Sequence, residues 1–113
     1  MVRSRVISLW LPVVAWAALI FALSAVPSLS SGLGEWDYVL RKCAHMTEYA
    51  VLAALLCRAL ERELPAFLAT VAYAVTDELH QHFVPGRHAS ATDVAIDAVG
   101  ASIGVLVWAR LRA

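Results

Sequence analysis

Charged side chains are scarce in this sequence. They make up 16% of its 113 residues, whereas hydrophobic residues make up 61%, which is more than a soluble domain of this length uses. Nine Lys and Arg balance nine Asp and Glu, to a formal net charge of +0, so we expect no nucleic-acid partner. With a mean hydropathy of +0.71, this composition excludes intrinsic disorder and predicts a membrane protein.

Cysteine and recognisable catalytic motifs are also nearly absent. The two cysteines, Cys43 and Cys57, are separated by about 21 Å if their segment is helical, at 1.5 Å per residue. A disulfide bond between them is therefore excluded. Neither a Gly-x-Ser-x-Gly nucleophile motif nor a nucleotide-binding loop occurs, so we expect no cofactor and favour a protein that is not an enzyme.

Four long apolar segments predict an all-α fold, a polytopic membrane protein with four transmembrane helices. The first contains no charged residue and is long enough to cross a hydrocarbon core of about 30 Å. It exceeds the apolar length of a signal peptide, so we expect it to remain as a span. Pro65 follows a short charged turn and suits a first helical position, which predicts a tight hairpin of helices two and three. The predicted spans, in a single domain over residues 1–113, are residues 6–26, 38–60, 65–83 and 91–111.

The positive charges predict the orientation of this bundle. Six arginines fall on the side of the termini and three basic residues on the opposite side. Because cytoplasmic loops carry the excess of Lys and Arg, we expect both termini to be cytoplasmic. The first group is Arg3, Arg5, Arg58, Arg62, Arg110 and Arg112, and the second is Arg41, Lys42 and Arg87.

Polar side chains within the spans gather at the end of the bundle opposite the termini. The second and fourth predicted helices begin at this end, and the third ends there. A charge inside a span costs about 2.5 to 3.5 kcal/mol, so these residues need partners or a function. We predict an extracytoplasmic ligand-binding site made of Lys42, His45, Glu48, Glu78, Gln81, Arg87, Asp93 and Asp97.

Two interpretations of these charges follow from helix dipoles. The N-termini of the second and fourth helices, with Lys42 and Arg87, would form a site for an anion such as phosphate. Alternatively, Lys42 pairs with Asp77 or Glu78 of the antiparallel third helix and the charges neutralise each other.

Gly100 and Gly104 lie four residues apart in the fourth predicted helix. A Gly-x-x-x-Gly pattern on a transmembrane helix lets the backbone of a neighbouring helix approach closely. We therefore expect a tightly packed helix contact below the polar site.

Three motifs occur together in order: Lys-x-x-His-x-x-Glu-Tyr from Lys42, Glu-x-x-Gln-x-Phe-x-Pro-Gly-Arg from Glu78 to Arg87, and the later Asp93. With their spacing, they resemble the VanZ-like family of small bacterial membrane proteins over roughly residues 10–110. The founding member is linked to resistance against the glycopeptide antibiotic teicoplanin, so the resemblance implies a cell-envelope setting. At Asp97 the family often has asparagine, and the carboxylate makes this site more acidic.

The leading hypothesis is a membrane protein that binds or handles an anionic envelope lipid, such as a phosphorylated polyprenyl lipid. Lys42 and Arg87 would hold the phosphate. One alternative is a salt-bridged helix bundle or a partner subunit without a ligand. Another is an intramembrane acid/base hydrolase with His45 or Glu78 as general base.

A metal site is a further alternative, because His80, His82 and His88 with Asp77 are metal-ligating residue types. Histidine pairs at a helix end are more often interfacial, so we assign no metal ligand. We expect a multi-pass protein of the cytoplasmic membrane that contacts lipid. A bundle of four short helices also suggests homo-oligomers or a larger envelope-protein partner.

Overall fold

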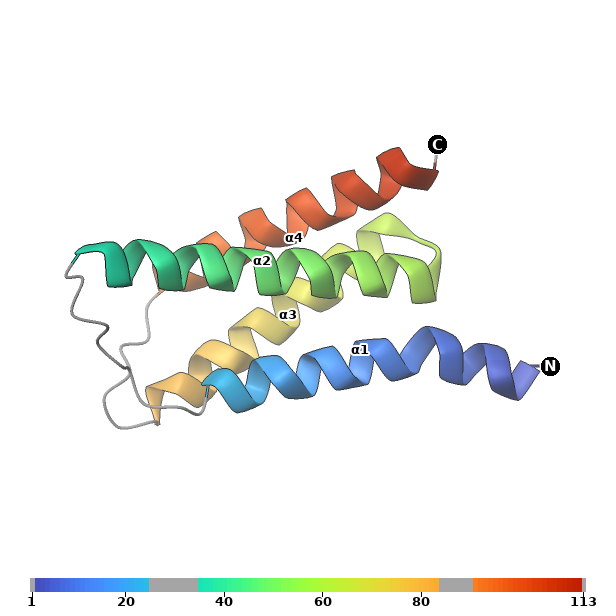
Figure 1. Ribbon diagram of the computed structural model, residues 1–113, viewed down its shortest axis with the longest axis horizontal. Helices are drawn as coiled ribbons and strands as arrows, with labels where there is room; N and C mark the ends of the chain where they lie inside the picture. The colour runs from blue at the N-terminus through green and yellow to red at the C-terminus, as the bar shows by residue number, and fades with distance from the viewer. Residues whose placement is uncertain (1, 25–34, 84–90, 113) are drawn as a thin grey trace.

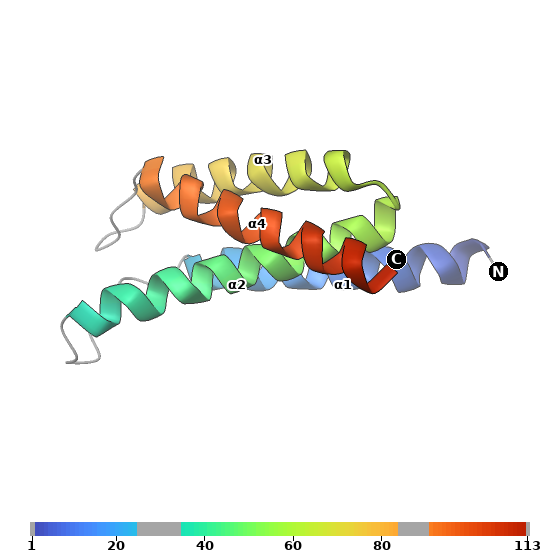
Figure 2. The same ribbon diagram turned by 90° about the horizontal axis from the view of Figure 1, so that it is seen from above.

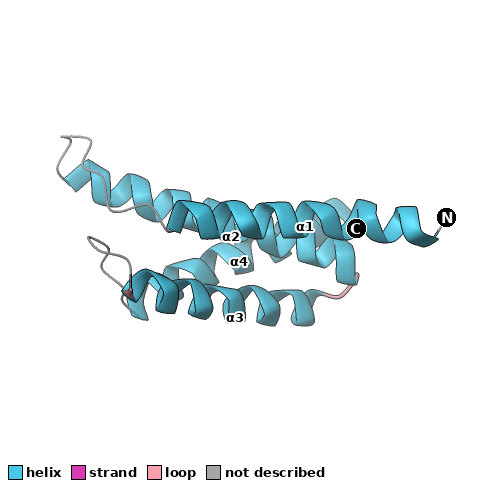
Figure 3. Ribbon diagram, turned by 90° about the horizontal axis from the view of Figure 1, so that it is seen from below, coloured by secondary structure: helices cyan, strands magenta, loops and turns pink. Residues whose placement is uncertain are grey.

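The computed structural model is made of four α-helices. It describes residues 2–24, 35–83 and 91–112. The helices are α1 (Val2–Ser24), α2 (Glu35–Leu60), α3 (Glu63–His82) and α4 (Ala91–Arg112). Figure 3 shows helix throughout this part of the chain, apart from the short connection between α2 and α3. The all-α prediction is confirmed for the described residues. Each predicted span coincides with one helix, except that residues 25 and 26 of the first lie outside the described residues and Phe83 follows the end of α3.

The helices lie side by side along an elongated molecule of 48 × 26 × 22 Å. Figure 1 shows both termini and the α2–α3 connection at one end of the bundle. α2 is central and packs on each of the other three helices, most extensively on α4. Because α3 is antiparallel to both of its sequence neighbours, α2 and α4 run parallel to each other, as Figure 2 also shows.

The predicted hairpin of α2 and α3 is present, and its turn is tight. Glu61 adopts the left-handed region with φ of 57°, and its N–H donates to the Cys57 carbonyl at 2.7 Å. This bond closes the C-terminus of α2 in the manner of a left-handed helix cap, a position that glycine usually occupies. The turn thereby reverses the chain within two residues.

Three of the helices are long and apolar enough to cross a membrane. Within the described residues these segments are Ser4–Leu23, Val39–Leu60 and Ala91–Arg112. α3 does not reach that level of hydropathy, because its last turns carry Asp77, Glu78, His80, Gln81 and His82. Large apolar side chains also face outward, including Leu11, Val14 and Leu106, which suits a lipid environment.

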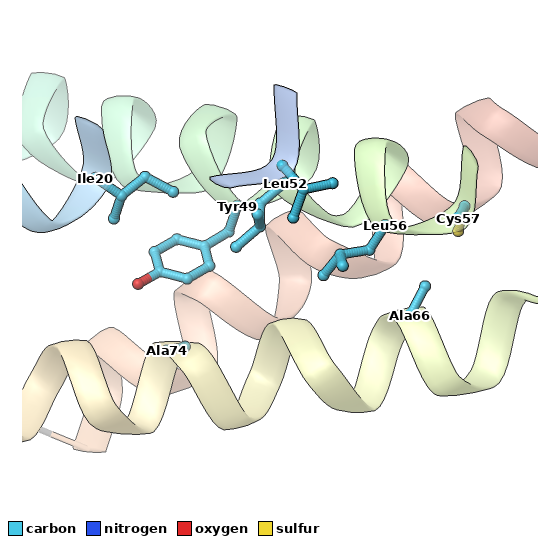
Figure 4. Close-up of a cluster of buried hydrophobic side chains, with 8 residues drawn as sticks. Ile20, Tyr49, Leu52, Leu56, Cys57, Ala66 and Ala74 are labelled. Atoms are coloured by element: carbon cyan, nitrogen blue, oxygen red, sulfur yellow. The ribbon is translucent and has the colours of Figure 1, made fainter. Parts of the chain in front are cut away.

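A small apolar core lies between α1, α2 and α3. Figure 4 shows Leu56 of α2 extending toward α3, Ala66 of α3 pointing back toward α2, and the ring of Tyr49 lying over Ala74. Ile20 of α1 reaches the same cluster and is fully buried. Small residues on α3 thus leave room for large side chains from α2, which sets the rotation of the two helices.

α1 is attached to the bundle by side chains that bond to backbone carbonyls. Trp16 Nε1 donates to the Glu48 carbonyl at 2.8 Å, and the Tyr73 hydroxyl donates to the Ala17 carbonyl. Arg58 Nη1 donates to the Ser8 carbonyl at 3.2 Å. These bonds are directional, so they fix the height of α1 against α2 and α3.

The Arg58 contact has a specific cause in the sequence of α1. Pro12 lies inside this helix, and proline lacks the N–H that would bond to the carbonyl four residues earlier, which is that of Ser8. Inside a membrane no water molecule is available to donate a hydrogen bond to this carbonyl. Arg58 of α2 supplies the donor instead, and its Nη2 also lies 3.4 Å from the Ser8 hydroxyl.

α2 and α4 approach most closely at the two glycines of α4. A Cβ added at Gly100 would lie 3.0 Å from the Met46 carbonyl carbon, and one at Gly104 would lie 2.8 Å from that of Ala50. Both would also collide with the carbonyl oxygens. The predicted close contact of the Gly-x-x-x-Gly motif is therefore confirmed, and α2 is the neighbour.

Candidate functional site

The first polar contact joins α2 to the start of α4. Lys42 Nζ forms an ion pair with Asp93 Oδ1, and the two side chains are 23% and 9% exposed. The glycine contact one to three turns further along brings these helices close enough for the pair to form. The structure therefore places a carboxylate of α4 against Lys42; the predicted pairing of Lys42 with Asp77 or Glu78 of α3 stays a prediction.

The second polar contact repeats this pairing one helical turn deeper. His45 Nδ1 lies 3.4 Å from Asp97 Oδ1, and the Asp97 side chain is 2% exposed. Lys42 and His45 are three residues apart, and Asp93 and Asp97 are four residues apart. Each spacing is about one helical turn, so the two parallel helices place both pairs at matching heights. α2 and α4 thus share a ladder of two polar pairs, Lys42 with Asp93 and His45 with Asp97, above their glycine contact.

The third polar contact joins α2 to α3. The Tyr49 hydroxyl donates to Asp77 Oδ2 at 2.7 Å, and Asp77 is 3% exposed. Within the described residues, Asp77 Oδ1 has no hydrogen-bond partner, and neither has Nδ1 of His80. The His80 ring stacks on Phe21 of α1, with 4.2 Å between ring centroids. Each helix of the bundle therefore contributes to the surroundings of this end.

The other predicted site residues also belong to this end of the bundle. Gln81 is buried in the last turn of α3, while Glu48 and Glu78 are half-buried. Each of these three residues has an interaction partner of its own. Arg87 lies outside the described residues, between the end of α3 and the start of α4 in sequence. Seven of the eight predicted site residues are therefore placed at one end of the molecule.

Two residues of the cluster were not in the predicted site. Tyr49 and Asp77 form a buried hydrogen bond of 2.7 Å within it. The sequence did contain a signal for both, because Tyr49 follows His45 by four residues and Asp77 precedes Gln81 by four. At helical spacing each residue shares a face with a predicted site residue.

The metal alternative finds no geometric support in the part of the chain that is described. There, no three side chains of His, Cys, Asp or Glu are grouped so that they could hold a metal ion. His82 packs edge-on against Phe83, at 5.5 Å between centroids, and His88 lies outside the described residues. Cys43 and Cys57 are free thiols, as the sequence predicted.

The fold and the site together define a membrane protein of several helices with charged side chains buried at one end. The VanZ/LLP1 family model matches residues 3–112, nearly the whole chain. The chain therefore belongs to the VanZ/LLP1 family, and the predicted resemblance is confirmed. No curated protein and no solved structure gives a significant match.

Proposed function

We propose that this chain is a multi-pass protein of the bacterial cytoplasmic membrane with four spans and both termini in the cytoplasm. Three helices are apolar enough to span, and α3 would be the fourth. The tight turn after α2 supports α3 as the fourth span, because it reverses the chain so that α3 runs back along the bundle. α2 and α4 pack on α3 and shield the polar side chains that lower its hydropathy.

The polar end then faces the outside of the cell and binds the phosphate of an anionic envelope lipid, such as a polyprenyl phosphate. The observation that carries this proposal is the parallel packing of α2 and α4, which brings two helix N-termini to the end that holds Lys42. Backbone N–H groups and the helix dipoles favour an anion there. Arg87, which precedes α4 in sequence, would supply a second cation and a bidentate fork for phosphate.

Membership of the VanZ/LLP1 family adds a biological setting to this proposal. Because the founding member of the VanZ-like family is linked to teicoplanin resistance, handling of an envelope lipid would connect this chain to glycopeptide resistance. Lys42 and Arg87 would bind the phosphate, and Asp93 would orient Lys42 through their ion pair.

A second candidate function is favoured by the same ion pairs. Lys42 already faces Asp93, and His45 faces Asp97, so both carboxylates of α4 have a partner on α2 without a ligand. Under this alternative the polar end fixes the register of two parallel helices, or docks on a larger envelope protein.

The experiment that separates the two candidates measures the melting temperature of the purified protein with and without a polyprenyl phosphate. We expect the lipid to stabilise the wild type, the Arg87→Ala variant to lose this stabilisation, and Arg87→Lys to retain part of it because lysine lacks the bidentate fork. Arg62→Ala, at the opposite end of the bundle, is the matched control and keeps the full effect. Equal melting with and without lipid in the wild type would favour the structural role.

A further inference from the structure

The polar end of α3 holds two buried polar atoms that the protein itself leaves unsatisfied. Within the described residues, Asp77 Oδ1 and His80 Nδ1 have no hydrogen-bond partner. Asp77 and His80 are three residues apart, so their side chains lie on neighbouring positions of one helix face. Buried polar atoms are nearly always paired with protein, water or ligand, so this pair of atoms points to a group that binds between them.

Both side chains are held in place. Asp77 accepts the hydrogen bond of Tyr49 through its other oxygen, at 2.7 Å, and Tyr49 is anchored in the core that Figure 4 shows. The His80 ring is held by its stack on Phe21 of α1, at 4.2 Å. Two acceptor atoms are thereby presented at a junction of three helices with little freedom to turn elsewhere.

Charge distinguishes Asp77 from the neighbouring carboxylates. Asp93 faces the ammonium of Lys42, and Asp97 faces His45. Asp77, at 3% exposure, has a neutral hydroxyl as its hydrogen-bond donor. A carboxylate buried this deeply calls for a cationic donor.

Hydrogen-bond counting narrows the kind of donor. With the ring proton of His80 on Nε2, its Nδ1 is an acceptor, as is Asp77 Oδ1. A hydroxyl group has one O–H, so it can donate a hydrogen bond to only one of these two acceptor atoms. A primary ammonium has three N–H donors and no acceptor, so it can serve both and neutralise the carboxylate.

We infer that the lipid bound at this end carries a primary ammonium beside its phosphate, and that Asp77 and His80 bind the ammonium. This inference rests on the proposed function, because it adds a second group to the same phosphate-bearing ligand. Lys42 and the N-terminus of α4 then bind the phosphate of this lipid, and Asp77 and His80 of α3 bind its ammonium.

The test is native mass spectrometry of the full-length protein with three lipids of identical acyl chains. Phosphatidylethanolamine carries the primary ammonium, phosphatidylcholine carries the same charge without N–H donors, and phosphatidic acid carries the phosphate alone. We expect the wild type to retain phosphatidylethanolamine about tenfold more tightly than phosphatidylcholine, which corresponds to one hydrogen bond to a charged group. Asp77→Asn keeps the shape and an acceptor for Tyr49, and we expect it to lose the preference.

The control variant is Glu63→Gln, which makes the same chemical change at the exposed first turn of α3 and keeps the preference. Equal binding of all three lipids by the wild type overturns the ammonium inference and leaves the phosphate proposal standing. Absence of binding by any of them overturns the ammonium inference, and the melting measurement with a polyprenyl phosphate decides the phosphate proposal separately. A preference that persists in Asp77→Asn removes Asp77 from the site.

Discussion

At the scale of single residues, the ion pair of Lys42 and Asp93 differs from an ordinary surface pair. Its side chains are 23% and 9% exposed, whereas those of Arg5 and Glu61 are 71% and 60% exposed and their charges lie 3.8 Å apart. Exposed pairs contribute about 0 to 1 kcal/mol. Removal of one partner from a buried pair costs about 3 to 5 kcal/mol, because it leaves the other charge uncompensated.

We therefore predict that Asp93→Ala destabilises the protein strongly, toward the lower part of that range because Lys42 keeps some exposure. The double variant Lys42→Asp with Asp93→Lys should recover much of the loss, since it restores opposite charges. Thermal unfolding in detergent measures both. Arg5→Ala is the control, with a melting temperature close to that of the wild type, and a mild effect of Asp93→Ala would mean that the pair contributes little.

At the scale of elements, the contact of α2 with α4 depends on the absence of side chains at Gly100 and Gly104. A side chain at Gly104 would meet the backbone of Ala50, which cannot rotate away as a side chain can. The helices would have to separate, and the Lys42–Asp93 and His45–Asp97 pairs above the contact would separate with them.

We predict that Gly104→Leu lowers the yield of folded protein and its melting temperature, and that Gly104→Ala does so to a smaller degree. Ile103→Leu is the control, because Ile103 is the preceding residue of α4 and faces outward. Size-exclusion chromatography and thermal unfolding measure the result. A Gly104→Leu protein with normal yield and stability would contradict the packing of α2 on α4.

The hydrogen bond between Arg58 of α2 and Ser8 of α1 leads to a second prediction about the packing of helices. Arg58 donates to the Ser8 carbonyl that Pro12 leaves without its helical donor. Arg58→Leu should therefore destabilise the protein by about 0.5 to 1.5 kcal/mol, the net contribution of one hydrogen bond, because the contact is exposed. In a Pro12→Ala background the helix supplies its own N–H, so the same change should cost less.

A double-mutant cycle on thermal unfolding tests this coupling. We expect Arg58→Leu to have a clearly smaller effect in the Pro12→Ala protein than in the wild type. Arg62→Leu, four residues further along and exposed, is the control and should have the same small effect in both backgrounds. Equal losses for Arg58→Leu in the two backgrounds would show that the arginine does not compensate for the proline.

At the scale of the whole molecule, the two ends of the bundle differ in charge. Arginines surround the end with both termini, among them Arg58, Arg62 and Arg110, all of which are exposed. The buried carboxylates Asp77, Asp93 and Asp97 lie at the opposite end. A membrane with a negative cytoplasmic leaflet favours the arginine end on its cytoplasmic side.

We predict that reporter fusions after Arg62 and at Ala113 report the cytoplasm, and that a tag inserted next to His88 is accessible from outside. Labelling of single introduced cysteines in intact cells, in a background without Cys43 and Cys57, is an independent measurement. If the fusions after Arg62 and at Ala113 reported opposite sides, α3 and α4 would not both span, and the four-span proposal would fail.

The sequence by itself determined the helices, their approximate ends and the gathering of charge at one end. These properties depend on hydropathy and on spacing along the chain, and both are local. The close contact at Gly100 and Gly104 was also predictable, because the absence of side chains is a property of the residues themselves.

Only the tertiary structure decided which groups meet. Lys42 of α2 pairs with Asp93 of α4. The Tyr49 hydroxyl donates to one oxygen of Asp77, while the other oxygen has no hydrogen-bond partner within the described residues. The choice of partner depends on which helices are neighbours and on how far each helix is rotated about its axis, since successive residues are about 100° apart around an α-helix. Packing at the glycines of α4 and around Tyr49 sets that rotation, and it arises from contacts between segments far apart in the chain.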